Sequence, residues 1–421
     1  MGLSSVYRVA TANTYDLSIQ NIEQRESDIS TSEAQLTSGK RVSKASDDAV
    51  AATLAEEDQA HILQLQASQT AIAASQTALT QADSALGNAD TLLQQVNQLM
   101  VQAGDGSLSS TDRQTIATQL SNLREQLLAV ANTTDSQGLP LFGGLGGATQ
   151  PFIESYGPNG GVKYQGQPGQ YSPTTTTLPQ SVDGNAAWMN VPQGNGTFIA
   201  SLGNTNQGSL TTDMGSFTGT TVPAALAPGG PGYQIQFTSA TQFQIIDETT
   251  GNPVSLDNGT SGPFTFQAGQ TLTFGGGVNI TLNGTPAAGD VANLTPSLGN
   301  PGNIFQTIQN VVNALNSNQP NATANVQQEL QRGLAESQAA DNRLLVVRGQ
   351  VGDWLNRATA MTTNNQNTIT SLQSDISNLT DLDMVQGISN FQNQQNGLQA
   401  ALKSYAAVQQ QNLFQYLNIS G

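Results

Sequence analysis

Cys and His, two residue types common in nucleophilic and acid–base chemistry, are almost absent from this chain. Its 421 residues include no Cys and a single His, His61. The lack of Cys excludes disulfides, thiolate nucleophiles and Cys-ligated zinc, and one His excludes a two-His zinc site. A Ser–His–Asp set could only use His61, which we expect to be a packed or half-exposed residue of a long helix. The Gly-rich run 143–147 lacks the Lys-Ser/Thr of a phosphate-binding loop and is interpreted as a flexible joint, so we predict no catalytic residue, no metal ligand and no cofactor.

Two pairs of acidic residues have simple structural explanations. Asp47 and Asp48 follow Ser46 and precede an Ala-rich segment, so Ser46 as N-cap with two acids in the first helical turn accounts for them. Asp381 and Asp383 lie between two expected helices, where the same preference for acids at helix N-termini applies. Neither pair requires a catalytic or metal-binding role.

The charge balance excludes several partners. The chain has 13 Lys plus Arg against 30 Asp plus Glu, a net charge of −17, which repels nucleic-acid phosphates. Lys40, Arg41 and Lys44 form the one basic cluster. No apolar run of 18 residues is present, and the N-terminus lacks a basic region followed by an apolar one, so we expect no membrane insertion and no cleavable signal peptide. Export would then need another route.

Composition divides the chain into helical flanks and a central insertion. Residues 149–300 hold 25 of the 42 Gly and one basic residue, Lys163, whereas the flanks are rich in Ala, Gln and Leu. Asn-Gly dipeptides at 159–160, 195–196, 258–259 and 283–284 indicate tight hairpin turns. Strands are predicted at 233–237, 242–246, 264–266, 271–274 and 278–282. Long loops are expected from 158 to 232.

A heptad pattern dominates the flanks. Bulky residues recur every seven positions at Leu65, Ile72, Leu79, Leu86, Leu93 and Met100, and small ones follow each by three, from Ser68 to Ala103. This predicts a helix over about 46–104, and a similar pattern predicts another over about 323–380. Their matched lengths favour antiparallel pairing. The stripe alone fits either the core of a bundle or an intermolecular coiled coil.

Two outer helices are predicted at about 3–37 and 384–417, with shorter ones around 116–127 and 304–315. Outer helices this polar bury little apolar surface in a two-helix contact, so self-assembly is the simplest reason to keep them. The predicted fold class is mainly α: nested antiparallel heptad helices formed by both termini, with an inserted β-rich domain. The expected domains are 1–44 with 381–421, 45–148 with 301–380, and 149–300.

The loop at 38–48, Ser-Gly-Lys-Arg-Val-Ser-Lys-Ala-Ser-Asp-Asp, resembles the signature loop of bacterial flagellins and flagellar hook-associated proteins. The layout of the helical arms and the tail from Ser404 to Leu417 are also similar to that family. Three segments resemble the hook-associated members more than flagellin. They are the Lys-Arg-Val-Ser-Lys sequence of the loop, the Leu-Pro-Leu-Phe-Gly-Gly run at 139–144 and a β motif at 272–290.

The resemblance implies a structural adaptor without enzymatic activity that forms a ring-like layer between the hook side and the flagellin filament. The implied partners are further copies of the chain, hook-associated protein 1, flagellin, and the flagellar type III export apparatus with a chaperone. The implied location is secreted and extracellular, in the bacterial flagellum. A flagellin filament subunit is the alternative within the class. The alternative from another class is a secreted enzyme or carbohydrate-binding module in 149–300, where Trp188, Tyr164 and Tyr171 could stack on sugar, although core positions are commoner for such residues.

The residues expected to mediate assembly lie on the outer helices and in the basic loop. They are Ile22, Ile29, Leu36, Lys40, Arg41, Val42, Asp47, Asp48, Ile388, Leu398, Leu402, Tyr405, Leu413, Tyr416 and Leu417.

Overall fold

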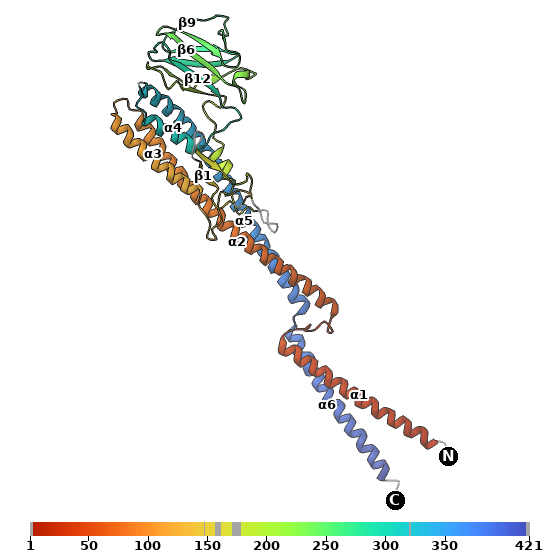
Figure 1. The fold of residues 1–421 in the computed structure, drawn as a ribbon. Helices are drawn as coiled ribbons and strands as arrows, with labels where there is room; N and C mark the ends of the chain where they lie inside the picture. Colours follow the sequence, from red (N-terminus) through yellow and green to blue (C-terminus); the bar gives the residue numbers. More distant parts are fainter. Residues whose placement is uncertain (1–2, 147, 156–160, 171–177, 320, 418–421) are drawn as a thin grey trace. The chain divides into compact units, whose positions relative to one another are not determined.

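The structure, a computed structural model, describes residues 3–146, 148–155, 161–170, 178–319 and 321–417 (Figure 1). In the two terminal helices, side chains are described from residue 16 onward and up to residue 407, with residue 409. The chain divides into two compact units, 1–69 with 362–421 and 70–361. No described helix is long and apolar enough to cross a membrane.

The first unit is built from two antiparallel helix pairs. α1 (Leu3–Ser38) and α6 (Met384–Leu417) contact each other near the basic loop and diverge toward the two termini (Figure 1). Ser32 Oγ donates to Gln394 Oε1 at 2.7 Å in this contact. The first turns of α2 (Ala49–Ala103) pair with the last turns of α5 (Ala322–Thr380), where Gln69 Nε2 donates to Gln366 Oε1 at 3.3 Å. All four helices lie within three residues of their predicted bounds.

The core of the second unit contains the heptad rows of α2. The bulky residues Ile72, Leu79, Leu86, Leu93 and Met100 are at most 1% exposed, and the small row from Ser75 to Ala103 is buried as well. Asp83 contacts Arg348, and further along α2 the Met100 side chain lies beside Gly333, so α5 runs antiparallel to α2. α3 (Ser110–Ala131) and α4 (Ile304–Leu315) pack against each other and share this core. The stripe is therefore the core of a bundle within one chain.

The first part of the insertion packs on the helices. β1 (Phe152–Ser155), β2 (Gly161–Tyr164) and the π-helical turn η1 (Asn185–Met189) contribute to the same core as α2–α5. Trp188, fully buried, stacks on Phe305 of α4 with ring centroids 6.0 Å apart. The predicted joint at 143–147 is wrong for its described residues: Leu145 N–H donates to Gln167 O, and a Cβ on Gly144, whose φ is +67°, would lie 1.9 Å from that oxygen. These glycines allow close backbone packing.

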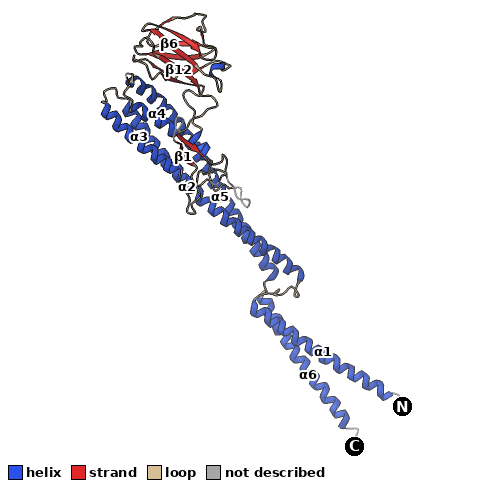
Figure 2. Cartoon of the chain, in the orientation of Figure 1, coloured by secondary structure: helices blue, strands red, loops and turns tan. Residues whose placement is uncertain are grey.

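The rest of the insertion forms two antiparallel sheets around a second core (Figure 2). The larger has the order β3-β12-β6-β7-β8 with β9 on β7, and the smaller has β10-β11-β4 with β5 on β11. The strands are β3 (Phe198–Leu202), β4 (Thr211–Thr212), β5 (Ser216–Phe217), β6 (Tyr233–Ser239), β7 (Gln242–Asp247), β8 (Asn252–Pro253), β9 (Phe264–Thr265), β10 (Gln270–Phe274), β11 (Val278–Asn283) and β12 (Val291–Pro296). The five predicted strands are confirmed. The expectation of loops over 158–232 is wrong because β2–β5, η1 and the 3₁₀ turn η2 (Ala224–Leu226) lie there.

Buried polar side chains of α5 fix the sheets to the helices. Gln328 Oε1 accepts the Thr212 N–H at 2.9 Å, and Glu336 Oε1 accepts the Gly194 N–H at 3.0 Å. The other Glu336 oxygen accepts the Thr307 hydroxyl of α4 at 2.7 Å. Because buried polar groups must be hydrogen-bonded, these contacts specify one placement of the sheets on α5.

We expect Leu86→Asp to lower the free energy of unfolding by several kcal/mol, because it places an unpaired charge in the core row. Gln95→Asp, at an exposed position of the same helix, is the matched control and should change stability by less than about 0.5 kcal/mol. Chemical denaturation followed by circular dichroism measures both. Equal midpoints for the two variants would contradict the packing of α2 on α5.

Candidate functional site

The basic loop between α1 and α2 is fastened to the turn between α5 and α6 by main-chain hydrogen bonds. The N–H groups of Arg41 and Val42 donate to Thr380 O at 2.8 and 3.2 Å, and Leu382 N–H donates to Gly39 O at 2.9 Å. Val42 is buried at 7% exposure, and Gly39 has a φ of +68°, which ends α1 without strain. The loop is thus an ordered connection, in which Gly39 provides the turn after α1 and Val42 is the buried apolar residue.

Two ion pairs accompany the main-chain contacts. Lys40 Nζ lies 2.5 Å from Asp381 Oδ1, and Arg41 Nη1 lies 3.1 Å from Asp48 Oδ2. Arg41 also donates to Leu379 O at 2.6 Å. The pairs are largely exposed, so they orient the loop more than they stabilise it. The prediction for Asp381 is corrected here: hydrogen bonds from Lys40 and Ser377 lower its pKa, and it caps no helix. Asp383 does cap α6, accepting the N–H groups of Val385 and Gln386.

Asp47 and Asp48 accept hydrogen bonds from different main-chain N–H groups. Asp48, and not the predicted Ser46, is the N-cap of α2, because its carboxylate accepts the Ala51 N–H at 3.0 Å. Asp47 closes the loop by accepting the N–H groups of Ser43 and Lys44 at 3.0 and 2.9 Å. These main-chain donors lower the pKa of both carboxyl groups. The proline-free loop therefore gains its shape from acids that remain ionised at neutral pH.

The predicted assembly residues of the outer helices are incompletely covered. Ile22, Ile29 and Leu36 of α1 and Leu398 and Tyr405 of α6 are half-buried, whereas Ile388 and Leu402 are 46% and 44% exposed. Gly387 is the one buried residue among the described ones of α1 and α6. Leu413, Tyr416 and Leu417 belong to α6, but their side chains lie outside the described residues. Their roles in assembly stay predictions.

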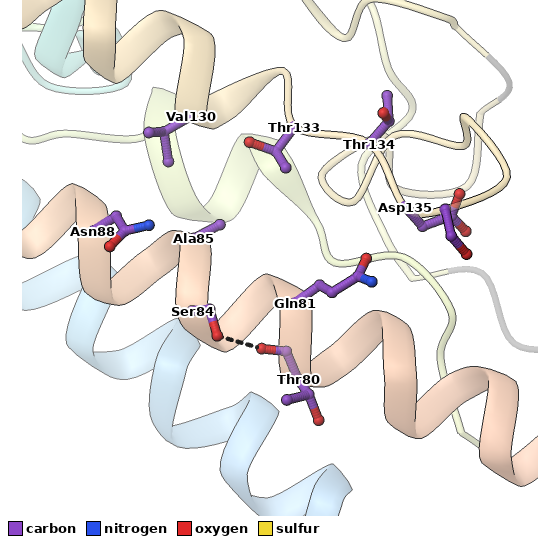
Figure 3. A pocket seen from close by; sticks show the side chains of 10 residues that line it. Thr80, Gln81, Ser84, Ala85, Asn88, Val130, Thr133, Thr134 and Asp135 are labelled. Carbon is purple, nitrogen blue, oxygen red and sulfur yellow. Dashed lines mark hydrogen bonds between the residues drawn. The ribbon is translucent and has the colours of Figure 1, made fainter.

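A hollow of about 450 Å³ beside α2 offers no catalytic set (Figure 3). It is lined by Thr80, Gln81, Ser84, Ala85, Asn88, Val130, Thr133, Thr134, Asp135 and Ser136. The Asp135 carboxylate already accepts the N–H groups of Gln137 and Leu139, and the Ser84 hydroxyl donates to Thr80 O. His61 is exposed, and within the described residues no three His, Asp or Glu side chains could hold a metal ion.

Two family models match the helical flanks around the insertion. Residues 9–146 match the bacterial flagellin N-terminal helical region, and residues 335–417 match the C-terminal helical region. Together they cover more than half of the chain, with the basic loop in the first and the α5–α6 turn in the second. The chain belongs to the bacterial flagellin family.

Within that family the chain is similar to flagellar hook-associated protein 3. It is 29% identical to this protein of Salmonella typhimurium over 155 residues, which cover 36% of this chain and 47% of the relative. The chain thus spans about half the length of the curated relatives it matches. Crystal structures of FlgL from Xanthomonas campestris and of the flagellar junction protein FlgL from Legionella pneumophila have TM-scores of 0.64 and 0.63 at 27% and 28% identity. The matches cover 77% and 72% of this chain and 99% of each structure.

We expect Asp48→Ala to fray the start of α2, lowering the hydrogen-exchange protection of the Ala51 and Ala52 amides about fivefold through loss of the cap. Asp48→Asn keeps a capping oxygen and loses the charge facing Arg41, so it should retain most of that protection. In the wild type, protection should persist above pH 3.8 and fall as the pH drops through the lowered pKa of Asp48. Similar losses in both variants would show that the ion pair, and not the cap, holds the helix start.

Proposed function

We propose that the chain is a structural adaptor of the bacterial flagellum that joins the hook side to the flagellin filament by helical self-assembly. The observation that carries this proposal is the uncovered apolar surface of α1 and α6. Leu17, Ile388 and Leu402 are between 44% and 55% exposed, on helices with almost no buried residue of their own. The similarity to hook-associated protein 3 supports the junction in particular.

The energetics of α1 and α6 favour burial by other copies of the chain. Burying apolar surface contributes roughly 25 cal/mol per Å², and a helix pair that buries little is marginal in water. Additional helices against the exposed sides of α1 and α6 would cover Ile388, Leu398 and Leu402. A closed layer gives every copy the same neighbours. Self-assembly is thus the simplest arrangement that would bury the apolar side chains of α1 and α6.

The remaining parts of the proposal concern partners and domain roles. Flagellin would follow the layer, hook-associated protein 1 would precede it, and the flagellar export apparatus with a chaperone would deliver the chain outside the cell. Residues 1–44 with 381–421 would assemble, 45–148 with 301–380 would form the supporting bundle, and 149–300 would be the surface domain. The chain would have no catalytic activity.

Two alternatives to the junction role are a flagellin filament subunit and a carbohydrate-binding insertion. A flagellin filament subunit is compatible with the family models and needs a genetic test. For a carbohydrate-binding insertion, aromatic rings should be available to stack on sugar. Trp188 is fully buried, and Tyr164 is half-buried against Phe152. Tyr171 lies outside the described residues.

Electron microscopy of a deletion strain distinguishes the two flagellar roles. Loss of a junction layer should leave hooks without filaments and release unpolymerised flagellin into the medium, whereas loss of one filament subunit should change only filament composition. Complementation by the wild-type gene is the control. Normal filaments in the deletion strain would contradict the junction role.

We expect Leu398→Ser combined with Leu402→Ser to abolish incorporation at the hook tip, because it removes apolar surface that neighbouring copies would bury. Thermal melting of the isolated chain should barely change, since neither side chain is fully buried. Export should continue, with the variant found in the medium. Gln395→Ser with Gln399→Ser, at exposed polar positions of α6, is the matched control and should support full filaments.

Two outcomes would refute this assignment. Full filaments with the leucine double variant would show that the α6 stripe is not an assembly surface. A large drop in the melting temperature of the isolated chain would show that the stripe is already packed within the monomer.

A further inference from the structure

One flank of the α2–α5 pair carries charged residues at heptad spacing. Arg348 Nε donates to Asp83 Oδ1 at 2.8 Å, which joins the two helices by an ion pair. The Arg348 guanidinium lies over Gly87, where a Cβ would be 3.5 Å away, and it also interacts with Asp90. Arg348 is therefore paired with Asp83 and feels the charge of Asp90 without forming an ion pair with it.

The next position of α5 along this flank holds an acid in place of a second cation. Asp341 lies seven residues before Arg348, and Asp90 lies seven residues after Asp83. The antiparallel pairing that joins Asp83 to Arg348 therefore places Asp341 opposite Asp90. Asp341 Oδ1 is buried and has no hydrogen-bond partner in the structure. Burial, followed by the contact with Asp90, raises the pKa of Asp341. Two ionised carboxylates that face each other would repel, and neither could donate a hydrogen bond to the other.

The charged groups around the pair favour a proton on Asp341. Asp90 faces it from α2, and the Asp90 carboxylate adds to the effect of burial in raising the pKa of Asp341. Arg348, one heptad away on α5, is held in its ion pair with Asp83. The shared proton would therefore be carried by Asp341, with Asp90 as the acceptor.

We propose that Asp90 and Asp341 form an acid-sensitive clasp between α2 and α5. In the protonated form a single O–H···O bond joins the helices, and at higher pH two like charges face each other across the bundle. The clasp belongs to the described bundle and does not depend on the proposed role in the flagellum. It is a reversible proton-binding site that tightens the helix pair on acidification.

The raised pKa of Asp341 determines how the stability of the folded chain changes with pH. The folded chain binds a proton at Asp341 more tightly than the unfolded chain, in which the pKa is near its ordinary value of 3.8. The stabilising contribution is therefore complete below pH 3.8 and is lost as the pH rises through the raised value. Other carboxyl groups, such as Asp112, have lowered pKa values and act in the opposite direction at low pH, so the test must compare variants.

Thermal unfolding of the full chain from pH 4 to 8 tests the clasp. Asp341→Asn removes the repulsion at neutral pH, so its melting temperature at pH 7.5 should exceed that of the wild type by roughly 2–4 °C. The difference should shrink as the pH falls toward 4 and Asp341 of the wild type takes up its proton. Asp353→Asn removes the same charge from an exposed position of α5 and should give a small difference that does not vary with pH. Asp90→Asn should reproduce the effect of Asp341→Asn, and the double variant should add little to either.

Three results would overturn the clasp. The first is a difference between wild type and Asp341→Asn that is the same at pH 4 and pH 7.5. The second is a lower melting temperature of Asp341→Asn at pH 7.5. The third is a rise in the wild-type melting temperature with millimolar Ca²⁺ at pH 7.5 that is absent from Asp341→Asn, because this would assign the pair to a cation and not to a proton.

Discussion

The packing of α2 on α5 through one bulky and one small row is the constraint on which the rest of the described structure depends. Leu79, Leu86 and Leu93 are almost fully buried, and the small residues between them allow close approach of the second helix. This packing places Gln328 and Glu336 of α5 beneath the sheets and next to α4. A change in register would therefore break polar contacts far from the heptad rows.

The described parts of the outer helices have no buried apolar rows of this kind. α1 and α6 keep the helical spacing, yet their apolar residues are few and stay partly exposed, and Gln and Asn fill the positions between them. Such helices are poor cores for one chain and suitable surfaces for contact with other copies. The loop at 40–48 is hydrogen-bonded to the α5–α6 turn, and this contact lies where α1 ends and α6 begins. The physical contrast between the two helix pairs is thus the basis of the proposed assembly role.

The sequence predicted the elements whose pattern is long and periodic. Helix bounds came within three residues because a heptad leaves little ambiguity over 50 residues. Ser46 was misassigned as the N-cap because Ser and Asp are both good caps and only geometry shows which carbonyl group begins the helix. β3 and β12 were missed because they pair with each other across a large sequence separation, without the short turn that connects β6 to β7 and β10 to β11. The Lys40–Asp381 pair could not be predicted, since its members are 341 positions apart.

The central claim is that assembly buries the α6 stripe, and thiol labelling tests it most directly because the native chain has no Cys. Leu402→Cys introduces one thiol at a position that is 44% exposed in the chain alone. Maleimide should label it rapidly in the purified protein and far more slowly in isolated flagella, whereas Thr271→Cys on the exposed surface of β10 should report how accessible the assembled protein remains. Protection of Leu402→Cys in flagella is the predicted result. Equal labelling of Leu402→Cys before and after assembly would contradict the claim.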